Sequence, residues 1–270
     1  MNYVSTPQLA PPSEIRVLGY RVHPLTGDEV IEQIAAAVAG KRRLVMANLN
    51  VHAMAVMFEN RAMARLLKQP DTQVMIDGMP IVMTANLFGH RLTRDKRVTS
   101  LDFYDRLFQL GQSAGWKFGY VGTTPETLEK GLATLRARIP GLDIDGIDGF
   151  FDISDDTPGS KQAAILDWMN ERAHDVVIVG MGMPRQEEWI ERIQSKVKTT
   201  VLVPTGAYLE YQVGVQKLPP RWMGRMGLEW AHRLASSPRR LGYRYLVEPA
   251  VLAFKLATRR HPQADGEPAS

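Results

Sequence analysis

Short apolar segments alternate with stretches of helical spacing along most of this 270-residue chain, and this alternation limits the possible fold more than any other feature. The apolar segments span residues 43–47, 74–76, 116–121, 175–179 and 201–203. Their nearly unbroken apolar runs are typical of strands that are buried on both faces of a parallel sheet. We therefore predict an α/β fold, with a Rossmann-like, mostly parallel sheet and helices on both of its faces.

The residues that follow the predicted strands are the candidate binding residues, because ligands of such sheets lie beyond the carboxyl ends of the strands. This rule selects Asn48, Asp77, Gly122, Gly180, Gly182, Pro184, Gln186 and Gly206. The carboxylate of Asp77 could accept a proton from an attacking hydroxyl group. It could instead be the N-cap of the helix that we expect to begin near Pro80, and its position alone favours the cap.

The glycine turn at residues 180–187, Gly-Met-Gly-Met-Pro-Arg-Gln-Glu, places free backbone N–H groups at the start of a predicted helix. Such a turn suits a diphosphate, although a plain strand-to-helix turn would have the same residues. It differs from the dinucleotide-binding fingerprint, since Arg185 stands where the third glycine is required. A nucleotide-cofactor oxidoreductase is therefore an alternative function that this motif disfavours, and we predict no cofactor.

Residue types that bind metal ions are poorly placed in this sequence. The chain has no cysteine, which excludes thiolate ligands, and its six histidines show no ligand spacing. Asp143 and Asp145 form a D-x-D pattern like the one that holds a metal ion and a nucleotide diphosphate in some glycosyltransferases. We interpret this pattern as a solvated acidic strand and loop, and we predict no metal site.

Positive charge is concentrated near the C-terminus. Residues 221–260 contain nine Lys and Arg against two acidic residues, whereas residues 1–220 contain 24 against 25. Trp and Tyr residues are interleaved with these bases, as in helices at a membrane interface. The bases could form a solvated helix face, a nucleic-acid site, or a site for anionic lipid or a diphosphate. No nucleic-acid-binding motif supports the second interpretation.

The composition divides the chain into four parts. We predict a flexible N-terminus at residues 1–14, an α/β domain at 15–215, a basic, amphipathic helical appendage at 216–260 and a disordered tail at 261–270. The N-terminus lacks the basic and apolar regions of a signal peptide. Because no stretch has the roughly 18 apolar residues that a spanning helix needs, we expect no membrane crossing.

Taken in order along the chain, the motifs resemble those of the WecG/TagA/CpsF glycosyltransferases (glycosyltransferase family 26). They are Ala47-Asn48, Asp77-Gly78, Arg97-Val98-Thr99, Gly122, Gly149-Phe150-Phe151, the block at 180–189, and the blocks at 219–222, 227–230 and 238–240. The match covers residues 15–250. The blocks at 77–80 and 181–186 are most similar to the branch that contains the xanthan-type β-1,4-glucosyltransferase.

This resemblance implies an inverting, metal-independent enzyme with an α/β domain and a C-terminal appendage that docks on the membrane. The enzyme would move a hexose or an N-acetylhexosamine, by glucosyl or N-acetylmannosaminyl transfer, from a UDP-sugar to a sugar on a polyprenyl diphosphate. Surface or exopolysaccharide synthesis at the inner face of the plasma membrane is the implied setting, without a nucleic-acid partner. A non-enzymatic adaptor that binds anionic lipid or nucleic acid through the basic helices is the other alternative.

The resemblance also implies roles for individual residues. Asp77 matches the proposed general base, and Asn48 and Gln186 match positions that contact the sugar or the nucleotide. Arg97 matches an arginine of the pocket. The appendage arginines that approach a diphosphate are matched by Arg233, Arg240 and Arg244. Met46 stands where the family often has threonine, and this difference bears on the identity of the donor sugar.

Overall fold

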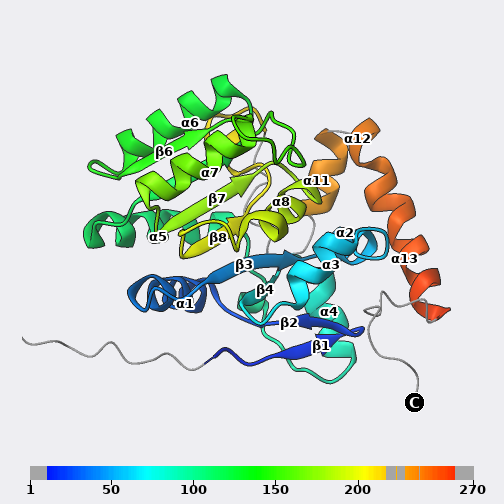
Figure 1. Ribbon diagram of the computed structural model, residues 1–270. Coiled ribbons are helices and arrows are strands. Elements are labelled where there is room, and N and C mark those ends of the chain that lie inside the picture. The colour runs from blue at the N-terminus through cyan, green and yellow to red at the C-terminus, as the bar shows by residue number, and fades with distance from the viewer. Residues whose placement is uncertain (1–10, 217–222, 224–228, 237, 259–270) are drawn as a thin grey trace, which may run out of the picture.

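The computed structural model describes residues 11–216, 223, 229–236 and 238–258. It confirms the predicted α/β class: parallel strands form one sheet in the order β4-β3-β8-β7-β5-β6, with helices around it (Figure 1). The strands are β3 (Leu44–Leu49), β4 (Thr72–Ile76), β5 (Phe118–Gly122), β6 (Ile144–Ile147), β7 (Val176–Gly180) and β8 (Val201–Pro204). A short antiparallel hairpin, β1 (Ile15–Val17) and β2 (Tyr20–Val22), lies beside β4.

The sheet is buried on both faces because alternate side chains of its strands enter different cores. In β7, Val177 and Val179 contribute to a first core, and Val176 and Ile178 to a second. The first core also contains residues of α2 (Val51–Val56), α3 (Arg61–Lys68), α4 (Met79–Leu87), α7 (Lys161–Arg172) and α8 (Arg185–Ile193). The second contains residues of α1 (Gly27–Ala39), α5 (Ser100–Ala114), α6 (Pro125–Arg138) and α9 (Tyr208–Gln212). The apolar runs in the sequence follow from this double burial.

Several helices begin at residues whose side chains cap them. Thr26 and Glu29 form the predicted capping box at the start of α1. Thr124 caps α6 through its side chain. α4 has no such cap: its N-cap is Gly78, without a side-chain cap hydrogen bond. The interpretation of Asp77 as a helix cap is therefore wrong, and its carboxylate is left for another role.

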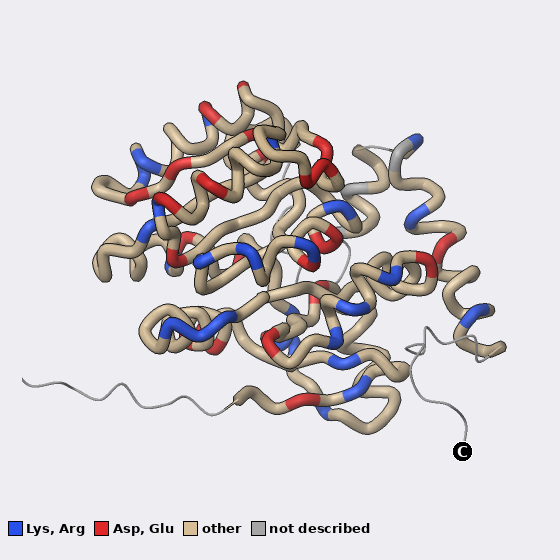
Figure 2. Tube along the Cα trace, viewed as in Figure 1, with Lys and Arg blue, Asp and Glu red and all other residues tan. Residues whose placement is uncertain are grey.

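The C-terminal segment continues as α11 (Glu229–Ser236), α12 (Pro238–Gly242), a π-helical turn η2 (Tyr243–Val247) and α13 (Glu248–Ala257). Lys and Arg positions outnumber Asp and Glu along these helices (Figure 2). α13 packs on α2, and Leu252 enters the first core. The side chains of Arg233 and Arg240, and the predicted tail, lie outside the part that the structure describes. Among the described helices, none has both the length and the apolar character needed to cross a lipid bilayer.

Candidate active site

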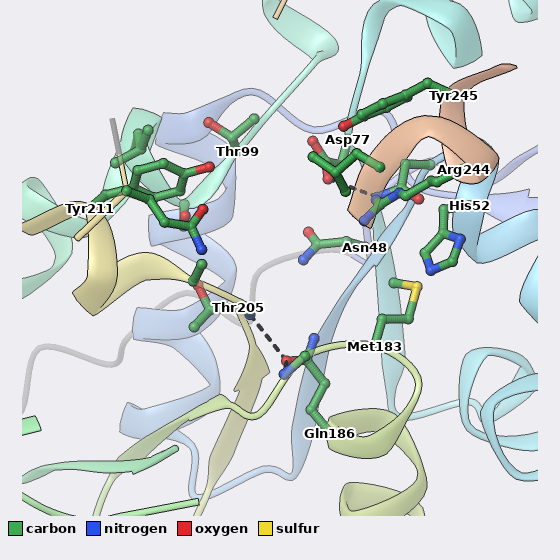
Figure 3. Close-up of a pocket in the computed structure, with 18 of the residues that line it drawn as sticks. Asn48, His52, Asp77, Thr99, Met183, Gln186, Thr205, Tyr211, Arg244 and Tyr245 are labelled. Carbon is green, nitrogen blue, oxygen red and sulfur yellow. Dashed lines mark hydrogen bonds between the residues drawn. The ribbon is translucent and has the colours of Figure 1, made fainter. Parts of the chain in front are cut away.

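A cavity of about 800 Å³ opens at the carboxyl edge of the sheet, where the sequence predicts the binding residues (Figure 3). Residues at or after the ends of β3, β4, β7 and β8 line one part of it: Asn48, Asn50, Asp77, Gly182, Met183, Gln186, Thr205 and Gly206. The C-terminal segment lines another part with Leu241, Tyr243, Arg244, Tyr245 and Glu248. The cavity therefore combines the sheet edge with the basic helices that follow it.

Asp77 directly follows β4, and its side chain lines the cavity. Its Oδ2 accepts a hydrogen bond of 3.0 Å from Nδ2 of Asn50. Asn50 is itself fixed, since its Oδ1 caps α2 by accepting from the N–H of Ala53 at 2.9 Å. This contact orients the Asp77 carboxylate, and no hydrogen bond from the described residues occupies its Oδ1, so this oxygen could accept a proton from a substrate group.

Asn48 lies on β3 and connects that strand to the end of β8. Its Nδ2 donates a hydrogen bond of 3.1 Å to the carbonyl oxygen of Pro204. In Figure 3 it lies between Asp77 and Gln186. Met46, two residues earlier on the same strand, is fully buried in the second core and does not line the cavity. Any effect of Met46 on the donor sugar must therefore pass through the packing of β3.

Gln186 lies in the first turn of α8 and is only 3% exposed. Its Oε1 accepts hydrogen bonds from the N–H groups of Gly182 at 3.0 Å and Gly206 at 3.1 Å. Its Nε2 donates to Oε1 of Glu187 at 2.8 Å. The amide thus joins the loops after β7 and β8, and little of it is left for the direct contact with sugar or nucleotide that the resemblance implies.

Glu187 is buried next to Gln186, and its Oε2 has no hydrogen-bond partner among the described residues. Burial disfavours the charged carboxylate and raises the pKa of Glu187 to about 7. Because Oε1 of Glu187 accepts from Nε2 of Gln186, it fixes which end of the Gln186 amide faces the two backbone N–H groups. This role could not be predicted from the sequence, since nothing in the letters Gln-Glu indicates that both side chains are buried.

Four of the sequence-predicted residues do not line this cavity. Gly122 and Gly180 pair on adjacent strands, where a Cβ on Gly122 would lie 2.3 Å from the carbonyl oxygen of Gly180. Close backbone packing therefore requires these glycines. Pro184 is the N-cap residue of α8. Arg97 directs Nη2 toward Oδ2 of Asp102 at 3.6 Å, and the structure does not bring it to the described wall of the cavity.

The C-terminal segment is fixed to the cavity wall by His52 on α2, a residue that sequence reasoning missed. Nδ1 of His52 lies 2.9 and 2.8 Å from the two carboxylate oxygens of Glu248, at the start of α13. Burial and the neighbouring Arg244 lower the pKa of His52, and Glu248 opposes that shift. Arg244 lines the cavity together with Asp77 (Figure 3). Its buried Nε has no hydrogen-bond partner in the described part of the chain.

A smaller hollow of about 340 Å³ adjoins the cavity, and the two share Gly182, Gly206, Ala207 and Gln216. Gly180, Arg185, Phe150 and Glu210 also line it. Arg185 donates hydrogen bonds to the carbonyl oxygens of Gly149, at 3.0 Å, and Phe151. It therefore anchors the loop after β6 at the position where a dinucleotide fingerprint has glycine. Oε2 of Glu210 is buried without a hydrogen-bond partner among the described residues.

The D-x-D pattern lies at the amino end of β6, away from the carboxyl edge where both hollows open. Arg172 contacts Asp143 at 2.7 Å and Asp145 at 2.9 Å. Nε2 of the buried His174 lies 2.7 Å from the other oxygen of Asp145. These carboxylates are therefore engaged in an ion-pair cluster at the far edge of the sheet from Asp77.

Comparisons with known proteins place similar sequences in one family. A model of the Glycosyl transferase WecG/TagA/CpsF family matches residues 15–265. Proteins of Staphylococcus aureus strains MW2 and NCTC 8325 / PS 47 are 24% identical over 247 residues, which is 91% of this chain and 92% of each relative. A relative in strain MRSA252 is 23% identical over the same shares. All three are named N-acetylglucosaminyldiphosphoundecaprenol N-acetyl-beta-D-mannosaminyltransferase.

Proposed function

Because this chain belongs to the WecG/TagA/CpsF family of glycosyltransferases, we propose that it transfers a sugar from a UDP-sugar to a sugar carried on a polyprenyl diphosphate. The name of the relatives supports a lipid-diphosphate acceptor, since theirs is N-acetylglucosaminyldiphosphoundecaprenol. The transferred group is an N-acetylhexosamine such as N-acetylmannosamine, or a hexose such as glucose. Family membership leaves the oxidoreductase and the adaptor alternatives without support.

The single observation that carries the proposal is that Asp77 and Arg244, 167 positions apart in sequence, line the same cavity. In the proposed single displacement, an acceptor hydroxyl oxygen forms a bond to the anomeric carbon of the donor. The bond from that carbon to the diphosphate oxygen breaks, and its electron pair leaves with UDP. Oδ1 of Asp77 takes the hydroxyl proton, and the anomeric configuration is inverted.

The departing diphosphate must have its negative charge stabilised within the cavity. Arg244 supplies a cation there, and its unpartnered Nε is a donor that a phosphate oxygen would satisfy. Thr205 also lines the cavity, and its hydroxyl oxygen is buried. Arg233 and Arg240 are assigned the same task through the resemblance, and their side chains lie outside the described residues.

The smaller hollow suits the nucleotide of the donor. It is continuous with the cavity through their shared loops, so that one ligand can extend from Asp77 into both. Phe150 offers an exposed ring on which a base can stack, and the unpartnered oxygen of Glu210 can accept an N–H of that base. We place the sugar near Asp77 and the uracil near Phe150 and Glu210.

The acceptor determines where the enzyme works. A polyprenyl chain stays in the bilayer, so the cavity must reach sugars at the membrane surface, and the bases of the C-terminal segment suit anionic lipid headgroups. Leu246, Val247 and Phe254 are exposed on the same helices. We therefore place the enzyme at the cytoplasmic face of the plasma membrane, held there in part by this segment.

A donor screen tests the proposal. The full chain is incubated with each of several UDP-sugars and a short-chain lipid-diphosphate-sugar acceptor, and products are read by mass. We expect an acceptor enlarged by one hexose or N-acetylhexosamine with release of UDP. If no UDP-sugar enlarges the acceptor while the protein is folded, the proposed donor or acceptor class is wrong.

A further inference from the structure

The outward face of α4 is apolar, which is unusual for a helix on a protein surface. The inner face of the helix packs into the first core through Ile81, Val82 and Ala85. On the outer side, Met83 is 66% exposed, Leu87 is 83% exposed, and Phe88 at the helix end is 62% exposed. These three residues are called the α4 face below.

Two exposed bases follow the α4 face. Arg91 and Arg94 form no ion pair with any described residue, whereas the nearby Lys96 pairs with Glu29 at 2.8 Å. An exposed apolar helix face bordered by free arginines is the pattern of a helix that lies in a membrane interface with anionic lipid. The charges therefore favour a bilayer over a purely apolar protein partner as the occupant of this surface.

The position of α4 supports the same occupant. The helix begins two residues after Asp77, at the carboxyl edge of the sheet, and the α4 face lies in its second half and at its end. α13, with exposed Phe254, packs on α2, and α2 and α4 follow the neighbouring strands β3 and β4 (Figure 1). The α4 face and the C-terminal segment thus both lie at the β3–β4 side of the sheet.

We propose that the α4 face inserts into the interfacial layer of an anionic bilayer, with Arg91 and Arg94 on lipid phosphates, and holds the catalytic edge against the membrane. This inference rests on the proposed function, because an acceptor on a polyprenyl diphosphate has its sugar at the bilayer surface. Contact through the C-terminal segment alone would leave the enzyme free to tilt, and a second contact through the helix that follows Asp77 fixes its orientation.

The test compares the full-length protein with the variant Leu87→Gln/Phe88→Gln. Both side chains point away from the core, and glutamine keeps the helix favourable. Leu110→Gln, at a less exposed apolar position on α5, is the control. Binding is measured by co-sedimentation with vesicles of phosphatidylglycerol and phosphatidylcholine. Transfer is measured with a lipid acceptor in those vesicles and with a water-soluble short-chain acceptor.

We expect the double variant to bind vesicles about tenfold more weakly or worse, since burial of a single Leu-sized side chain is worth about that factor. Transfer in vesicles falls with it, while transfer to the soluble acceptor and the melting temperature stay near wild type. In Arg91→Gln/Arg94→Gln, binding falls on anionic vesicles but not on pure phosphatidylcholine.

Vesicle binding unchanged in the double variant would overturn the inference. The inference would also be overturned if sedimentation velocity showed that wild type is a dimer and the double variant a monomer, while both bind vesicles equally well. The α4 face would then be covered by a second copy of the chain. Failure of the proposed function looks different: wild type would transfer to neither acceptor, whatever the variants do on vesicles.

Discussion

Gln186 and Glu187 form a buried pair in which one side chain sets the orientation of the other. If the Gln186 amide turned over, its NH₂ group would face the N–H groups of Gly182 and Gly206, and two hydrogen bonds would be lost. Glu187 prevents this because it accepts from Nε2. The loops after β7 and β8, which shape the cavity and the smaller hollow, thus depend on Glu187, which does not line the cavity, as well as on the side chains that do.

The raised pKa of Glu187 makes this pair a source of pH-dependent stability. The folded protein holds the carboxyl proton up to about pH 7, whereas the unfolded chain loses it near its ordinary pKa of 4.5. The carboxyl therefore contributes its full stability below pH 4.5, and that contribution is lost as the pH rises through 7. By pH 8 the loss amounts to about 3 kcal/mol.

Glu187→Gln should remove this dependence while keeping an acceptor for Nε2 of Gln186. From pH 4 to pH 8, the unfolding free energy of the variant, measured by urea unfolding, should rise by about 3 kcal/mol relative to that of wild type. Glu191→Gln is the control, since Glu191 pairs with the exposed Arg65 at the surface. A constant difference between Glu187→Gln and wild type across this range would show that Glu187 is ionised in the folded protein.

The sequence predicted which residues line the cavity better than it predicted what each of them does. Asp77 and Asn48 follow from the rule that ligands lie at strand ends, and both line the cavity. The same rule selected Gly122 and Gly180, whose close backbone approach is visible only once β5 and β7 are paired. His52 and Glu210 went unnoticed because neither directly follows a predicted strand and each depends on contacts from another part of the chain.

On the scale of helices and strands, the contact between α2 and α13 decides where Arg244 lies. Burial and Arg244 keep the pKa of His52 low, so the imidazole is neutral at pH 7 and donates its Nδ1 hydrogen to Glu248. This hydrogen bond is partly shielded from water. A second link between the same elements, Lys255 to Glu59 at 2.7 Å, is at the surface, since Glu59 is 80% exposed.

Glu248→Gln should loosen the C-terminal segment more than Glu59→Gln does. The first change weakens a shielded bond to a charged group, worth about 1.5–3 kcal/mol, and the second removes a surface pair worth about 1 kcal/mol or less. Hydrogen exchange of residues 243–257 should therefore speed up in Glu248→Gln and stay near wild type in Glu59→Gln, with a parallel fall in kcat. Equal exchange in the two variants would mean that His52 does not hold the segment.

The strands that the sequence revealed are those buried on both faces. β7 and β8 are apolar and buried throughout, whereas β6 reads Ile-Asp-Gly-Ile and only its first residue, Ile144, is buried. The hairpin of β1 and β2 has three residues in each strand, too few for any periodicity to appear. The π-helical turn η2, which carries Arg244, also has no signal in the sequence pattern.

At the scale of the whole molecule, two acidic sites lie at opposite edges of one sheet. Asp77 faces the cavity at the carboxyl edge, and Asp143 and Asp145 are paired with Arg172 and His174 toward the amino edge. A D-x-D motif that holds a metal-bound diphosphate would have to lie at the cavity. We therefore expect EDTA to leave glycosyl transfer intact. Loss of turnover in EDTA that Mg²⁺ or Mn²⁺ restores would contradict this.

The joining of Asp77 and Arg244 in one cavity could not be worked out from composition or spacing. It depends on α13 returning to α2, a contact between segments about 200 residues apart. The charge distribution predicted an anionic partner for the C-terminal segment, but only the resemblance implied that this segment also approaches the substrate. The α/β class and the mostly parallel sheet, by contrast, follow from the apolar runs of the strands, whereas the strand order and the sixth strand, β6, are seen only in the structure.

The account depends most on the proton transfer at Asp77, and the turnover of Asp77→Asn tests it most directly. The substitution keeps the shape of the side chain, so donor binding should stay near wild type while kcat falls by about 10²–10⁴-fold. Both are measured on the full-length enzyme, with UDP-sugar affinity by calorimetry and transfer by mass. A variant that binds the donor normally and turns over at nearly the wild-type rate would contradict the account.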